Sequence, residues 1–90
     1  MKINIYTIPE CPFCTKLKGL LDETNIKYDE LNVYDDENEQ LFDSLVELSG
    51  SESVPMITIG KHLLAPDVNF KSIEEAVKLI KHILKNESDN

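Results

Sequence analysis

The chain has 90 residues, 41% of them hydrophobic and 29% charged, which are ordinary proportions for one globular domain covering residues 1–90. Seventeen acidic residues and nine lysines, without an arginine, give a net charge of −8, which argues against binding to nucleic acid or to anionic membranes. No apolar run approaches the ~20 residues that cross a bilayer, and no signal-peptide pattern follows Met1. We therefore expect a soluble cytoplasmic protein, and a monomer.

Residues 2–8 are predicted to form the first strand. They are rich in β-branched and aromatic side chains, and Pro9 closes the run. Because apolar residues dominate it, we expect a central strand that is covered on both faces of the sheet.

The stretch Cys11-Pro12-Phe13-Cys14 follows this strand and opens an amphipathic segment. Cys11 is expected at the start of a helix, where free N–H groups and the positive end of the dipole favour an anion such as a thiolate. Cys14 lies one turn further on the same face and can attack a mixed disulfide formed on Cys11. The spacing indicates redox chemistry in a reducing compartment, with two buried structural cysteines or half of a zinc site as the alternatives.

Helical spacing of apolar residues predicts a first helix from Pro12 to about Thr24, and a half-polar pattern predicts an edge strand at residues 28–33.

An acidic run follows at residues 35–39. We interpret it as the N-terminus of a second helix, whose dipole favours acids there, and not as a docking patch for a basic partner. The second helix carries its apolar residues between 41 and 48 and ends at Gly50.

The C-terminal third is predicted to form a hairpin and a last helix. Strands at 56–59 and 62–65 flank a two-residue turn, residues 66–71 are irregular, and a capping box at 72–75 opens the helix. The polar tail from Asn86 is expected to fray. The order β-α-β-α-β-β-α predicts an α/β fold with a four-stranded mixed sheet and helices on both faces. Its first two strands are parallel and its last two antiparallel.

Two blocks of the sequence, from Tyr6 to Leu21 and from residue 49 to residue 62, are separated by the distance along the chain that the glutaredoxins have. The chain resembles this family of small oxidoreductases with a thioredoxin-like fold. Tyr6, the Cys11–Cys14 stretch, Lys18 and Leu20-Leu21 are similar to the family's C-P-(Y/F)-C-x-x-x-K-x-L-L block. Residues 49–55 are similar to its T-G-x-x-T-V-P segment, and residues 60–62 to the hairpin that follows. The resemblance extends from about residue 3 to residue 64.

This resemblance implies a thiol–disulfide oxidoreductase that reduces protein disulfides or glutathione mixed disulfides by dithiol exchange. Cys11 would be the nucleophile and Cys14 the resolving thiol. Val54-Pro55 would be a cis peptide facing the cysteines. The residues expected to bind substrate or glutathione are Phe13, Lys18, Ser53, Val54, Pro55 and Asp67. Glutathione is then a candidate co-substrate, and neither a permanently bound cofactor nor a metal is expected.

The sequence departs from the family pattern around the expected glutathione site. Ile8 stands where the family commonly has a lysine, Leu64-Ala65 replaces a Gly-Gly pair, and Val68 follows Asp67 where a second acid is usual. Two alternatives therefore stay open: a thioredoxin-like electron donor, for example to ribonucleotide reductase, that does not depend on glutathione, or a module that binds an iron–sulfur cluster. A zinc site is disfavoured, because His62 and His82 are twenty residues apart.

Overall fold

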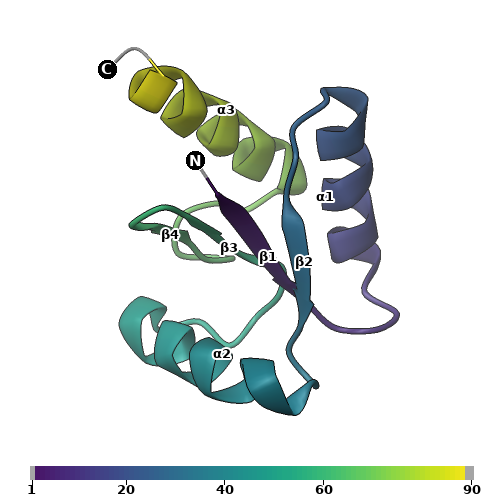
Figure 1. Ribbon diagram of the computed structural model, residues 1–90, viewed down its shortest axis with the longest axis vertical. Coiled ribbons are helices and arrows are strands. Elements are labelled where there is room, and N and C mark those ends of the chain that lie inside the picture. The colour runs from purple at the N-terminus through teal and green to yellow at the C-terminus, as the bar shows by residue number, and fades with distance from the viewer. Residues whose placement is uncertain (1, 89–90) are drawn as a thin grey trace.

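The computed structural model describes residues 2–88, and its helices and strands follow the predicted order (Figure 1). They are β1 (Ile3–Thr7), α1 (Pro12–Glu23), β2 (Asp29–Asn32), α2 (Asp36–Ser49), β3 (Met56–Ile59), β4 (His62–Leu64) and α3 (Ile73–Ser88). The strands form one sheet in the order β2-β1-β3-β4. The central position predicted for the first strand is therefore confirmed.

The parallel pair of β1 and β2 and the antiparallel hairpin of β3 and β4 agree with the prediction, which did not address the pairing of β1 with β3. β1 and β2 are parallel, with Ile5 opposite Glu30, whereas β1 and β3 are antiparallel, with Ile5 opposite Ile57. β3 and β4 form the antiparallel hairpin, in which Ile57 pairs with Leu64. The parallel pair places the end of β1 and the end of β2 at the same edge of the sheet, next to the start of α1.

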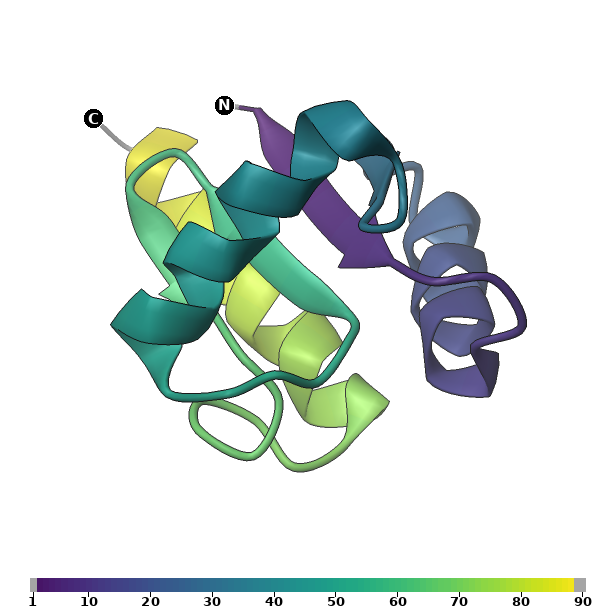
Figure 2. The same cartoon turned by 90° about the horizontal axis from the view of Figure 1, so that it is seen from below.

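Helices cover both faces of the sheet. α1 and α3 lie side by side on one face, and α2 crosses the other (Figures 1 and 2). The larger core cluster lies under α1 and α3 and includes Ile5, Leu17, Leu21, Ile57, Ala76 and Ile80, none of them exposed. A smaller cluster of Tyr6, Met56 and Ala65, with Phe42 and Leu45 packed against it, lies under α2. None of the helices within residues 2–88 combines the length and the apolar character needed to cross a membrane.

The helix ends follow the signals in the sequence. α2 has acidic residues in its first turn, and Gly50 ends it in the left-handed conformation (φ 79°) with its N–H donating to the Val46 carbonyl at 2.8 Å. At the start of α3 the Ser72 Oγ accepts from the Glu75 N–H at 3.1 Å, while the Glu75 carboxylate accepts from the Lys71 N–H at 2.9 Å. These bonds satisfy backbone donors that have no partner within the helix.

Several element ends differ from the prediction, and β1 is one residue shorter at each end than the predicted 2–8. β2 is limited to Asp29–Asn32, because these four residues are the ones that pair with β1, from Asn4–Asp29 to Thr7–Asn32. β4 ends at Leu64, because the Ala65 N–H donates to the Asn69 side chain (2.9 Å) and not to β3. The tail from Asn86 continues α3 as far as Ser88, and residues 89–90 lie outside the described part of the chain.

Candidate active site

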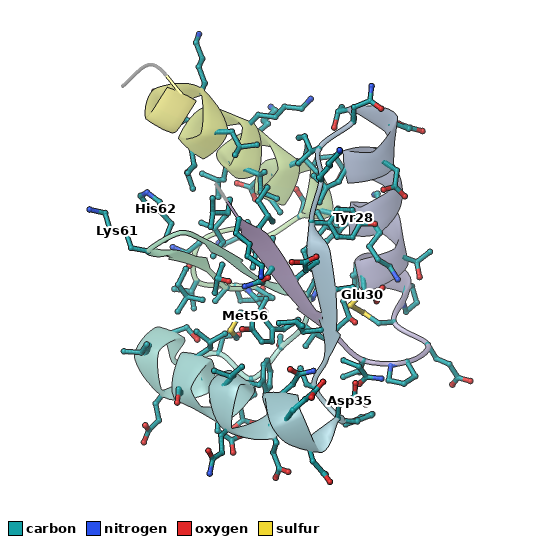
Figure 3. The ribbon with its side chains drawn as sticks, in the orientation of Figure 1. Tyr28, Glu30, Asp35, Met56, Lys61 and His62 are labelled. Atoms are coloured by element: carbon teal, nitrogen blue, oxygen red, sulfur yellow. A yellow bond between two sulfur atoms is a disulfide. The ribbon has the colours of Figure 1, made fainter. Side chains whose placement is uncertain are left out.

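Two cysteines mark the junction between the end of β1 and the start of α1. Cys11 is the N-cap residue of α1, with extended backbone angles, and its Sγ accepts a hydrogen bond from the Cys14 N–H at 3.1 Å. The two are joined by a disulfide, with their Cα atoms 5.3 Å apart. Figure 3 shows this bond at the beginning of the helix. Cys11 is 9% exposed and Cys14 only 2%, so the first cysteine is the more accessible of the two.

The local sequence explains why the helix begins here. Pro12 occupies the first helical position, where its missing N–H leaves no donor unsatisfied. Both the N–H and the hydroxyl of Thr15 donate to the Cys11 carbonyl, at 3.1 and 3.2 Å. Cys11 is thereby held at the positive end of the helix dipole, where a negative charge on its sulfur is stabilised.

A groove of about 330 Å³ begins at Phe13, the exposed side chain between the two cysteines in sequence. The loop that contains Val54-Pro55 forms part of its wall, and this peptide bond is cis, as the family resemblance implied. Of the six residues expected to bind substrate, five line this groove: Phe13, Ser53, Val54, Pro55 and Asp67.

The residues of this groove that the sequence reasoning missed include two with polar side chains. Lys71 and Ser72, which immediately precede α3, line it together with Asp67. They reach it because the loop between β4 and α3 folds back on itself, with the Asp67 N–H donating to the Phe70 carbonyl at 2.8 Å and Pro66 bridging to Phe70. The groove thus contains one cation and one anion from the same short loop.

Lys18, the sixth expected residue, lies elsewhere. It lines a separate hollow of about 460 Å³, to which both cysteines, Ile8 and Asp35 also contribute. Its ammonium forms an ion pair with Glu30 of β2 at 2.8 Å, and the Thr7 hydroxyl donates to the same carboxylate oxygen at 2.9 Å. In Figure 3 Glu30 is labelled beside the disulfide.

The electrostatics of this hollow centre on Glu30. The hydrogen bond from Lys18 holds the pKa of Glu30 below its ordinary value; partial burial opposes this effect, and the bond from Thr7 adds to it. Within residues 2–88 no group of three or more His, Cys, Asp or Glu side chains is arranged to hold a metal ion.

The glutaredoxin family model matches residues 3–64, which is well over half of the chain and includes both cysteines. The chain belongs to the glutaredoxin family. It is 36% identical over 87 residues to Glutaredoxin 1 of Rickettsia prowazekii, a match that covers 93% of this chain and 92% of that one. It is 40% identical over 57 residues to Glutaredoxin 1 of Rickettsia felis, covering 63% of this chain but little more than half, 56%, of that protein.

Solved structures confirm the thioredoxin-like glutaredoxin fold. A buckwheat glutaredoxin in complex with glutathione superposes with a TM-score of 0.67 at 15% identity, over 89% of this chain and 68% of that one. A thioredoxin-like protein superposes with a TM-score of 0.66 at 31% identity, over 87% of this chain and 99% of that one. The fold predicted from the sequence, a four-stranded mixed sheet with helices on both faces, is that of the glutaredoxins.

Proposed function

We propose that this member of the glutaredoxin family is a monomeric, cytoplasmic thiol–disulfide oxidoreductase that works through Cys11 and Cys14. One observation carries the proposal: at the N-terminus of α1 the Cys14 N–H donates to the Cys11 Sγ at 3.1 Å. A donor in this position, together with the helix dipole, favours a thiolate on Cys11. The thiolate is the form of cysteine that attacks disulfides.

The proposed reaction is a pair of thiol–disulfide exchanges. The Cys11 thiolate attacks one sulfur of a substrate disulfide, forming a mixed disulfide and expelling the other substrate sulfur as a thiolate, which takes up a proton. Cys14 then loses its proton and attacks the Cys11 sulfur, which releases the second substrate thiol. The substrate gains two electrons and the protein is left with the Cys11–Cys14 disulfide, the state described above. Two molecules of an external thiol return it to the dithiol form.

The groove beside Phe13 supports glutathione as that external thiol, and glutathione mixed disulfides as substrates alongside protein disulfides. Glutathione is a small peptide with carboxylates and an ammonium group, and Lys71 and Asp67 supply one partner for each kind of charge. The backbone of the loop at Val54, just before β3, can hold the central part of such a peptide by main-chain hydrogen bonds. We propose that glutathione passes through this groove as a co-substrate and is not kept as a bound cofactor.

A second candidate is a thioredoxin-like electron donor that is reduced by a reductase. The hollow beside Cys11 favours it, since Ile8, Glu10 and Asp35 line this side of the cysteines and its lysine is already paired with Glu30. An anionic thiol meets repulsion there.

One experiment distinguishes the two candidates. The oxidised protein is supplied either with glutathione, glutathione reductase and NADPH, or with thioredoxin reductase and NADPH, and reduction of a glutathionylated peptide is followed. We expect turnover with glutathione and none from Cys11→Ser. Turnover with thioredoxin reductase alone would favour the second candidate, and no turnover with either would contradict the proposed activity.

A further inference from the structure

The excess of negative over positive charge in this protein lies in one part of the chain. Residues 28–60 contain nine acidic residues and no lysine or histidine, whereas the rest of the chain has eight acidic residues against nine lysines. The segregated stretch includes the whole of α2 (Asp36–Ser49). α2 is the helix that covers one face of the sheet by itself (Figure 2). Residues 28–60 thus carry a formal charge of −9 and the remaining residues +1, so the net charge of −8 comes from this stretch.

The stability of α2 explains only some of its acidic residues. Those of the first turn suit the positive end of the dipole, but Glu47 lies in the last turn, where an acid is unfavourable. Glu39, Asp43 and Glu47 are spaced four residues apart and all exposed, so that they repel one another along one side of the helix. Among residues 2–88 no ion pair involves an acidic side chain of α2.

The same helix exposes apolar side chains. Leu41 is 52% and Leu48 78% exposed, and a spacing of seven residues places them on one side of α2, about 10 Å apart. Helical geometry places Gln40 and Ser44 between this leucine pair and the acidic row. The outward face of α2 therefore has an apolar edge and an acidic edge, and in Figure 2 no other element covers it.

This face begins at the active site. Asp35, the N-cap residue of α2, lines the same hollow as Cys11 and Cys14. It is labelled in Figure 3 at the end of the helix that lies nearest β2. A chain that lies along α2 can therefore extend to the cysteines without crossing the molecule.

We propose that the outward face of α2, formed by Glu39, Leu41, Asp43, Glu47 and Leu48, is a docking surface for substrate proteins. Its occupant is an amphipathic segment that carries lysines or arginines beside apolar residues, in the protein whose disulfide Cys11 attacks. The identification of this partner as a substrate rests on the proposed function. Charge complementarity favours this basic partner over a second copy of this chain, which would place acidic residues against acidic residues. Cations from the partner would relieve the repulsion within the acidic row.

Binding can be measured without any redox step. The probe is a fluorescent, cysteine-free helical peptide as long as α2, 14 residues, with leucines on one side and lysines on the other. Its twin has glutamate in place of every lysine. We expect the anisotropy titration to show binding of the lysine peptide at least about tenfold tighter than that of its twin, with a difference that shrinks as salt is added. Equal binding of the two peptides would overturn the proposal.

Three variants locate the contact. Asp43→Lys should weaken binding of the lysine peptide about tenfold and at the same time raise the denaturation midpoint of the free protein, because it replaces two repulsions by two attractions along the helix. The double variant Leu41→Ser, Leu48→Ser should weaken binding of the lysine peptide by a factor that does not depend on the salt concentration. Glu23→Lys, at the end of α1 remote from α2 (Figure 1), makes the same change in net charge and should have little effect. An equal loss from Glu23→Lys would show that only net charge matters, and would overturn the proposed surface.

Turnover separates this inference from the proposed function. The lysine peptide, extended by a pair of cysteines closed as a disulfide, should be reduced with a higher kcat/KM than its glutamate twin. A small uncharged disulfide should be reduced equally well by the wild type and by Asp43→Lys. If no disulfide is reduced although the lysine peptide binds, the proposed activity is wrong while the docking surface stands. If the small disulfide is reduced but Asp43→Lys reduces each of the two peptides with the same kcat/KM as the wild type, the docking surface is wrong.

Discussion

Lys18 and Glu30 form an ion pair of 2.8 Å that links α1 to the edge strand β2 beside the two cysteines. The pair is partly shielded, with side chains 28% and 41% exposed, and the buried Thr7 hydroxyl donates to the same carboxylate. The ammonium of Lys18, which the sequence suggested for substrate binding, is thus directed to a structural partner. We expect this ion pair to hold α1 against the edge strand of the sheet.

Glu30→Gln tests this role through its pH dependence. The pKa of Glu30 is lowered in the folded protein, so its contribution to stability is present above the ordinary value of 4.5 and is lost as the pH falls through the folded-state pKa. Because both side chains are partly exposed, we expect a loss of no more than about 1 kcal/mol at pH 7. Urea unfolding of the variant and the wild type should differ at pH 7, and the difference should shrink as the pH falls below 4.5. Glu52→Gln, an exposed control in the loop after α2, should not differ from the wild type at any pH; a deficit of Glu30→Gln that stays the same at every pH would refute the electrostatic account.

Lys71→Gln tests the groove beside Phe13. If Lys71 binds a carboxylate of glutathione, the variant loses one charged hydrogen bond, which at this exposed position corresponds to a rise in KM of about tenfold. The kcat should change little, because the cysteines are untouched. Steady-state kinetics with a glutathionylated peptide measure both, with Lys81→Gln on α3, outside the groove, as the control. An unchanged KM would remove Lys71 from the binding site.

Ser72→Ala tests the cap of α3. The Ser72 hydroxyl is the acceptor for the Glu75 N–H, and its loss should cost about 1 kcal/mol of unfolding free energy. Ser44→Ala is the matched control, since Ser44 lies inside α2, bonds only to the Gln40 carbonyl and is exposed. Its replacement should be neutral or slightly stabilising, because alanine is the better helix former. Chemical denaturation checks both, and equal stability of Ser72→Ala and wild type would count against the cap.

Local patterns made most of the fold predictable. The order of elements, the pairing of strands and the helix start at Cys11 follow from apolar periodicity, turn residues and capping residues that lie close together in sequence. The cis bond before Pro55 came from the family resemblance, since nothing in the local residues demands it.

Contacts between distant segments were not predictable in the same way. Lys18 meets Glu30 only once β2 has paired with β1, and the sequence contains several other acids that could have been its partner. Lys71 reaches the groove because the loop before α3 folds back at Phe70, and the Asn69 side chain takes the N–H of Ala65 where a further strand residue was expected. Such arrangements depend on three-dimensional packing, which periodicity does not encode.

The central claim is that Cys11 attacks and Cys14 resolves, and a trapping experiment tests it most directly. Cys11→Ser and Cys14→Ser are each incubated, reduced, with a disulfide-containing peptide, and the products are measured by intact-mass spectrometry. Without the resolving thiol, Cys14→Ser should accumulate the mixed disulfide on Cys11, whereas Cys11→Ser should form no adduct and show no turnover. Accumulation of an adduct on Cys14 in Cys11→Ser, or retention of activity by that variant, would contradict the assignment.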